Sequence, residues 1–96
     1  MNAEALSLEL KPKLAAKTKL RLDPKTGKYI LLYPEKGLLL NPTGAAILQR
    51  CDGQQALSAI IAALALEFHS DVDVLRVEVL TFVQGLLDRG LLRAEP

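Results

Sequence analysis

The sequence predicts a single α+β domain in which a three-stranded antiparallel sheet is followed by three helices. The first half of the chain contains short apolar runs separated by turn residues, whereas the second half carries apolar residues at helical spacing. Asn41-Pro42, between the two halves, has the composition of a helix start. A chain of 96 residues supports one hydrophobic core. We expect the domain over residues 17 to 96, preceded by a partly disordered N-terminal arm over residues 1 to 16.

The sheet is expected within residues 17 to 40. Polar and apolar residues alternate there as in half-buried strands, and turn residues interrupt the pattern at Asp23-Pro-Lys-Thr-Gly27 and at Pro34-Glu-Lys-Gly37. Connections this short join antiparallel neighbours, so the sheet should be a meander. The three strands are expected at Lys17–Asp23, Lys28–Tyr33 and Leu38–Leu40.

Three helices are expected after the Asn41-Pro42 step. Asn accepts hydrogen bonds from the first free amides of a helix, and Pro at the first helical position loses no bond. Gly53 and Gly90 mark later stops, because glycine takes the left-handed conformation without a side-chain clash. The helices are expected at Pro42–Cys51, Ala56–Phe68 and Val72–Arg89.

The third expected helix carries a wide apolar arc. Its apolar residues cover roughly 160° around the helix axis, whereas seating a helix on one core takes roughly 100°. Two interpretations stay open at this point: one edge of the arc faces outward, or the small domain buries the whole arc. The residues in the arc are Leu75, Val79, Leu80, Phe82, Val83, Leu86 and Leu87.

Residues that could support catalysis or metal binding are few and scattered. Cys51 and His69 are the only cysteine and histidine, and a predicted helix separates them. An internal disulfide, a multi-cysteine metal site and a paired nucleophile are therefore not expected. Asp71, Asp73 and Glu78 could act as acid and base or bind Mg²⁺, but acidic residues near a helix start already suit the helix dipole. We therefore expect no catalytic residue, no metal and no cofactor, and a protein that is not an enzyme.

Charge is unevenly distributed along the chain, although the net charge is only +1. Residues 1 to 41 carry eight Lys or Arg and four Asp or Glu, whereas residues 42 to 96 carry four and seven. A net acidic helical half argues against nucleic-acid binding, which concentrates cations on the docking element. The longest apolar run, Ala59 to Leu66, has eight residues against the roughly 20 that cross a bilayer. This predicts a cytoplasmic protein without membrane contact.

An open strand edge beside a long helix is the functional arrangement that this order of elements predicts. An extended peptide can add to such an edge through main-chain hydrogen bonds, while its alternate side chains enter the groove between strand and helix. The third strand and the third helix are the expected walls. The sequence therefore favours a peptide-binding module over a catalyst.

Several short motifs follow one another along the chain: Lys11-Pro-Lys-Leu14, Leu20-Arg-Leu-Asp23 with Gly27, Leu32-Tyr-Pro-Glu35, Leu39-Leu-Asn41 with Thr43, Ile47-Leu48 with Cys51-Asp-Gly53, Ile60-Ile61, and Asp88-Arg-Gly-Leu-Leu92. Together they resemble one known family, the D protein of pyrroloquinoline quinone (PQQ) biosynthesis. Each motif is weak alone, but their order and spacing over nearly the whole chain are specific. Two positions depart from the family pattern, because Ala56 stands where Thr or Ser is frequent and Gly44 replaces the more usual Ala, each at a cost of up to about 1 kcal/mol in helix stability.

The resemblance implies a peptide chaperone with a winged-helix-like fold of three strands and three helices. Family members bind the ribosomally made PQQ precursor peptide and present it to a radical S-adenosylmethionine (SAM) enzyme. Their domain is the prototype of the recognition element for ribosomally synthesised and post-translationally modified peptides (RiPPs). The resemblance further implies that the peptide adds to the third strand and packs on the third helix. Carried over by position, the peptide-binding residues are Gly37, Leu38, Leu39, Leu40, Asn41, Leu75, Val79, Phe82, Val83 and Leu86.

Two alternative functions and the oligomeric state stay open at the level of sequence. A DNA-binding winged helix has the same inventory of elements, but it calls for a basic recognition helix. The third helix holds only Arg76 and Arg89 against three acids. The same domain could also serve another modified-peptide pathway. An open sheet edge is compatible with a monomer or a homodimer.

Overall fold

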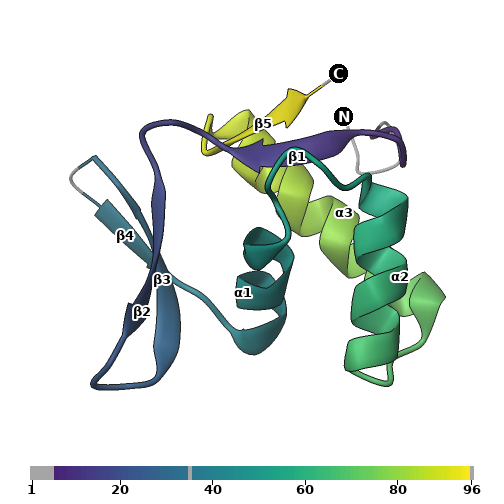
Figure 1. Cartoon of the computed structure of the whole chain (residues 1–96), viewed down its shortest axis with the longest axis horizontal. Helices are drawn as coiled ribbons and strands as arrows, with labels where there is room; N and C mark the ends of the chain where they lie inside the picture. Colours follow the sequence, from purple (N-terminus) through teal and green to yellow (C-terminus); the bar gives the residue numbers. More distant parts are fainter. Residues whose placement is uncertain (1–5, 35, 96) are drawn as a thin grey trace.

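Residues 6–34 and 36–95 are described in the computed structural model, in which a three-stranded sheet lies to one side of three helices (Figure 1). The strands β2 (Lys19–Asp23), β3 (Lys28–Tyr33) and β4 (Lys36–Leu39) form an antiparallel meander in that order. The helices α1 (Pro42–Gln49), α2 (Leu57–Glu67) and α3 (Val72–Asp88) follow. The predicted α+β class, with a three-stranded antiparallel sheet followed by three helices, is confirmed.

Local chemistry sets the boundaries of these elements. Asn41 caps α1, because its side-chain Oδ1 accepts a hydrogen bond from the Gly44 N–H at 2.7 Å. Asp71 caps α3 in the same way and accepts a bond from the Asp73 N–H at 2.8 Å. β2 begins two residues later than predicted, because Thr18 belongs to a turn that closes on a preceding carbonyl. The ends of the other predicted elements lie within two residues of the observed ones.

The hydrophobic core lies between the inner face of the sheet and the three helices. Burying one large aliphatic side chain is worth about 1.5–3 kcal/mol, so this cluster supplies the main stabilisation and fixes α3 relative to the sheet. The largest fully buried side chains are Leu31, Ile47, Leu48, Leu57, Ile60, Leu64, Val79, Val83 and Pro12. None of the helices in the described ranges combines the length and the apolar character that crossing a membrane requires.

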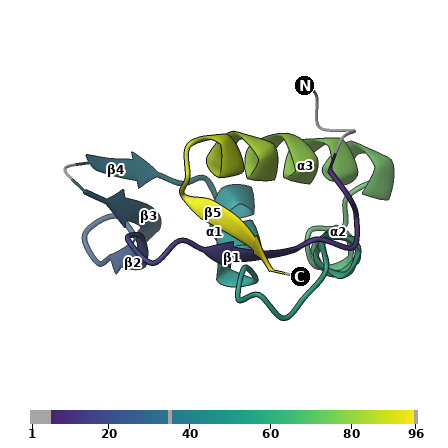
Figure 2. The same cartoon turned by 90° about the horizontal axis from the view of Figure 1, so that it is seen from above.

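A second, two-stranded sheet lies across the helices and was not predicted. β1 (Lys11–Leu14) pairs antiparallel with β5 (Leu92–Glu95), and Figure 2 shows the two strands side by side from above. Pro12 of β1 is fully buried. Residues 6 to 16 therefore pack on the domain instead of forming a disordered arm, so the folded domain starts before residue 17. The expectation for residues 1 to 5 falls outside the described residues.

The segment before β1 also completes the start of α2. The Leu57 N–H donates to the Leu10 carbonyl at 2.9 Å, and the Ser58 N–H donates to the Leu8 carbonyl at 3.0 Å. Ala56, at the cap position, has no side-chain acceptor. Main-chain carbonyls thus take the place of a side-chain cap, and they offset the stability loss expected at Ala56.

Candidate functional site

Strand β4 forms an open edge of the three-stranded sheet, because within residues 6–34 and 36–95 it pairs with β3 alone. The Leu40 N–H donates to the Tyr29 carbonyl at 3.0 Å. Hydrogen-bonded and non-bonded pairs alternate along an antiparallel ladder, so Leu39 and Gly37 occupy non-bonded positions. Their N–H and C=O groups therefore point outward, away from β3, and are available to another strand.

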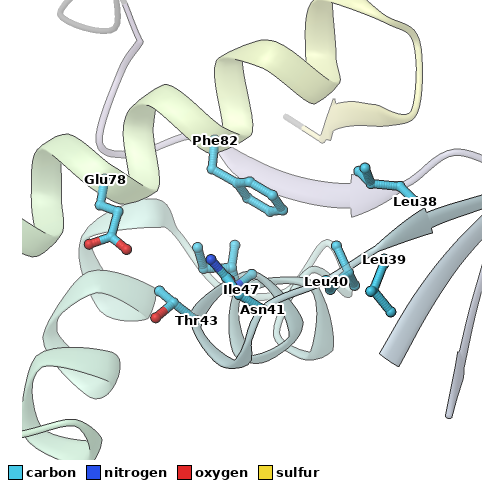
Figure 3. A pocket seen from close by; sticks show the side chains of 9 residues that line it. Leu38, Leu39, Leu40, Asn41, Thr43, Ile47, Glu78 and Phe82 are labelled. Carbon is cyan, nitrogen blue, oxygen red and sulfur yellow. The ribbon is translucent and has the colours of Figure 1, made fainter. Parts of the chain in front are cut away.

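A hollow of about 170 Å³ lies between this edge and α3 (Figure 3). In Figure 3 the ring of Phe82 points from α3 into the space above α1, and leucine side chains from the end of β4 line the opposite side. Glu78, one turn earlier on α3, directs its carboxylate to the side of Thr43 at the start of α1. The lining residues are Leu38, Leu39, Leu40, Asn41, Thr43, Gly44, Ile47, Glu78 and Phe82.

Glycine at position 44 lets Phe82 pack directly on α1. A Cβ atom at Gly44 would lie 3.3 Å from the Cζ atom of Phe82 and 3.1 Å from Oδ1 of Asn41, both tighter than ordinary contacts. Glycine in a helix costs up to about 1 kcal/mol relative to alanine. In exchange, the aromatic wall of the hollow approaches α1 more closely than an alanine would allow.

A strip of side chains on α3 continues the hollow along the helix. Val74, Val77, Glu78, Thr81 and Phe82 share the three- and four-residue spacing of one helix face. Val74 and Val77 are 64% and 63% exposed, and clustered exposed apolar residues mark interaction sites. The β4 edge, the hollow and this strip are together called the β4–α3 groove.

The sequence-predicted site residues fall into two groups. The strand residues Gly37 to Asn41 lie along the β4 edge, and all but Gly37 line the hollow. On the helix side, only Phe82 lines it. The other four predicted helix residues are core residues, at most 3% exposed, and offer no surface to a ligand: Leu75, Val79, Val83 and Leu86. The predicted helix residues other than Phe82 lie on the side of the apolar arc that faces the core, whereas the groove uses the adjacent side.

Four further residues that line the groove were not among the predicted site residues: Val74, Val77, Glu78 and Thr81. The signal for them is a second set of three- and four-residue intervals, next to the core-facing arc and interrupted by one carboxylate. Phe82 stands where this strip meets the core-facing arc. The apolar arc of α3 had two interpretations: one edge faces outward, or the domain buries the whole arc. The first interpretation therefore holds at Phe82.

Glu78 is the one ionisable side chain that lines the hollow. Within the part of the chain that the structure describes, its carboxylate has neither an ion pair nor a hydrogen bond, whereas Arg76 and Asp73 on the same helix pair with each other. Burying an unpaired charge is costly. A ligand that covers Glu78 therefore has to supply a cation or a hydrogen-bond donor.

Cys51 is a buried residue outside the groove. Its Sγ donates to the carbonyl of Ile47 at 3.2 Å. Burial, reinforced by the neighbouring Asp52, raises the pKa of the thiol to about 12, so the thiol is protonated and unreactive at neutral pH. His69, with φ of +52°, lies just past the end of α2. Over residues 6–34 and 36–95, no three His, Cys, Asp or Glu side chains gather closely enough to hold a metal ion.

Known proteins of one family match this chain over most of its length. The family model for coenzyme PQQ synthesis protein D (PqqD) matches residues 22–92. A PqqA binding protein of Rhodopseudomonas palustris (strain HaA2) is 34% identical over 88 residues, which cover 92% of this chain and 86% of that protein. A PqqA binding protein of Rhizobium meliloti (strain 1021) is 38% identical over 80 residues, which cover 83% and 82% of the two chains.

A solved structure has the same arrangement of elements. It is the solution NMR structure of the PqqD truncation of Methylobacterium extorquens PqqCD, which represents a functional and stand-alone RiPP recognition element. The similarity has a TM-score of 0.78 at 28% identity and covers 97% of this chain and 99% of that chain. These matches confirm the resemblance that the sequence motifs indicated. The chain therefore belongs to the PqqD family of coenzyme PQQ synthesis proteins.

Proposed function

We propose that this chain is a non-catalytic peptide chaperone of PQQ biosynthesis, which binds the ribosomally made precursor peptide and presents it to a radical SAM enzyme. The observation that carries the proposal is the open β4 edge beside the hollow at Phe82. Relatives of the chain are PqqA binding proteins, and the similar solved structure is a RiPP recognition element. Both matches support a role in peptide recognition.

The peptide backbone would pair with β4 as an added strand. Gly37 and Leu39 each direct one N–H and one C=O outward, so the docked strand forms up to four main-chain hydrogen bonds. Each bond contributes about 0.5–1.5 kcal/mol net. This part of the affinity does not depend on the peptide's side chains. Strand addition would also cover the open edge, which is otherwise a template for aggregation.

Alternate side chains of the docked strand would enter the groove and provide specificity. A cavity of about 150 Å³ holds a benzene molecule, so a hollow of about 170 Å³ has room for one aliphatic or aromatic side chain. Strand residues on one face are about 6.6 Å apart, and the strip from Val74 to Thr81 spans about 10 Å of helix. We therefore expect two apolar peptide residues, at positions i and i+2, one in the hollow and one on the strip near Val77.

The chemistry of the groove supports binding rather than catalysis or DNA recognition. Glu78 has no ionisable partner in the hollow with which to exchange a proton during a reaction. The strip on α3 combines valine, threonine and phenylalanine with this carboxylate. A helix that reads DNA presents Lys and Arg instead.

Amide shift mapping during titration with the PqqA precursor peptide tests the proposal. We expect saturable shifts at residues 37 to 41 and 74 to 82, together with slower solvent exchange of the Gly37 and Leu39 N–H groups. A peptide of the same composition in scrambled order is the control. Saturable shifts confined to other residues would place the site elsewhere, and no saturable shift would refute peptide binding. Presentation is tested by whether the radical SAM enzyme modifies the peptide faster when the chain is present.

A further inference from the structure

The face of the three-stranded sheet that points away from the core combines apolar side chains with cations. Ile30 and Leu32 stand in its middle on β3, and their cross-strand partners are Arg21 and Lys19 on β2 and Leu39 and Gly37 on β4. Cross-strand partners project from the same side of a sheet, and so do residues two apart on one strand. The outer sheet face is the set Lys19, Arg21, Lys28, Ile30, Leu32 and Leu39.

The apolar centre of this face is open to solvent. Ile30 and Leu32 are partly buried but do not belong to the side chains that pack on the hydrophobic core. Leu39 is 59% exposed. Gly37 adds no cover, because it lacks the Cβ atom that would lie 3.3 Å from Cγ2 of Ile30 and 3.4 Å from Cδ2 of Leu32. Three aliphatic side chains are thus presented on the side of the sheet opposite to the core.

Three cations flank this apolar centre, two of them on β2 and one at the start of β3. Lys19, Arg21 and Lys28 are exposed, and no carboxylate in the described ranges forms an ion pair with them. Asp23 also occupies a strand position on the outer sheet face. Its Oδ1 is engaged within the turn, where it accepts a hydrogen bond from the Lys25 N–H at 3.0 Å. An apolar centre inside a polar rim is the usual anatomy of a protein interface. The cationic rim requires a partner of opposite charge.

We propose that the outer sheet face is a second docking surface, which shares only Leu39 with the β4–α3 groove and which binds an acidic surface with an apolar centre on the enzyme that modifies the peptide. The identity of the partner rests on the proposed function, whereas the chemistry of the surface follows from the sheet itself. A protein fits better than a nucleic acid, because phosphates gain nothing by covering Ile30, Leu32 and Leu39.

A peptide bound at β4 would become part of this surface. The side chains of an added strand alternate between the two faces of the sheet, so every second peptide residue would stand beside Leu39 on the outer sheet face. The enzyme would then contact chaperone and peptide together. It should bind the loaded chaperone more tightly than the free one, and by linkage it should tighten peptide binding by the same factor.

Charge reversal at Arg21 tests the inference. The affinity of the PQQ radical SAM enzyme for the peptide-loaded chaperone is measured with wild type, Arg21→Glu and Ile30→Thr, and with Lys11→Glu on β1 as a control of equal charge change. Arg21→Glu is expected to weaken enzyme binding by about tenfold at low salt and by less at high salt, because added ions screen the attraction. Ile30→Thr should weaken it at both salt concentrations. The control and the PqqA affinity of every variant should stay within about twofold of wild type.

Equal enzyme affinity for wild type and a folded Arg21→Glu variant would overturn the inference. Loss of PqqA affinity in the same variant would also overturn it, because the outer sheet face would then belong to the peptide site. A labelled DNA duplex that binds the wild type but not Arg21→Glu at physiological salt, with enzyme affinity unchanged, would assign the face to nucleic acid. If the wild type does not bind PqqA, the proposed function is refuted. The peptide titration detects this outcome without the enzyme, so it is distinguishable from a failure of the inference about the outer sheet face.

Discussion

Replacing Leu39 by proline distinguishes the hydrogen bonds of the sheet from those of a docked strand. The Leu39 N–H points outward from β4, so its loss leaves the β3–β4 ladder intact. Proline is tolerated on an edge strand where the missing donor faces solvent. The leucine side chain is 59% exposed, so the substitution also removes little apolar burial. We therefore expect Leu39→Pro to fold.

The effect of Leu39→Pro on peptide binding follows from the two main-chain bonds at this residue. Proline has no N–H donor at this position, so the first bond is lost. Its pyrrolidine ring also occupies the space through which the facing carbonyl of the peptide would approach, and the displaced peptide strand then loses the second bond, to the main-chain carbonyl of residue 39. At about 0.5–1.5 kcal/mol for each bond, binding weakens by about 1–3 kcal/mol. This loss corresponds to a Kd higher by about 5- to 150-fold.

Fluorescence anisotropy with labelled PqqA measures the Kd of Leu39→Pro, and thermal unfolding establishes that the variant is folded. Leu39→Val is the matched control, because it shortens the side chain but keeps the N–H. Leu38→Pro is expected to disrupt the sheet, because the Leu38 N–H faces β3. A folded Leu39→Pro that binds PqqA as tightly as Leu39→Val would refute the strand-addition reasoning.

Three further predictions concern α3, the aromatic wall of the hollow and the buried thiol. Gly85→Ala should raise the free energy of unfolding in urea by up to about 1 kcal/mol, because a Cβ there meets nothing within 4 Å. Phe82→Ala should weaken PqqA binding by about 1–3 kcal/mol in calorimetry, because the ring is the aromatic wall of the hollow, and Val77→Ala should weaken it less. The thiol pKa of Cys51 is raised from 9.0 to about 12 in the folded state, so the folded state holds this proton more tightly than the unfolded state. The thiol's contribution to the free energy of unfolding is therefore complete below about pH 9 and is lost as the pH rises toward 12. Denaturation at several pH values should show this fall in the wild type, and the fall should be absent in Cys51→Ala.

Each of these predictions has a contradicting outcome. A Gly85→Ala variant no more stable than wild type would mean that another element covers this face of α3. For Phe82→Ala, an unchanged Kd in the folded variant would move the peptide away from the hollow. If Cys51→Ala loses stability at alkaline pH as steeply as wild type, other titrating groups carry that loss.

Local patterns predicted the strands of the meander and the three helices because their signals lie within a few residues of one another. β3 was predicted with its observed bounds, and Asn41 was predicted as the cap of α1. The pairing of β1 with β5 joins residues near opposite ends of the chain, and no local pattern reports such a partner. Pro12 even argues against a strand, since proline is confined to edges and strand starts.

The two halves of the groove differed in how far the sequence could predict them. The β4 edge followed from strand order and turn positions, because main-chain pairing does not depend on side-chain identity. The helix wall depends on the angle at which α3 is rotated against the core. Periodicity gives the width of an apolar arc but not that angle, so the buried Val79 and Val83 looked equivalent to the groove residue Phe82.

The contact between Phe82 and the backbone at Gly44 has a consequence for the thermodynamics of binding. The ring rests on α1, and the Asn41 cap of α1 is separated from β4 by Leu40 alone, so one connected set of contacts holds both walls of the groove. A receptor that is rigid before binding loses little conformational entropy, and the ordering cost then falls on the ligand. The unfavourable entropy of binding should therefore grow with the number of peptide residues that become ordered, while peptide flanks beyond the groove can be removed without loss of affinity.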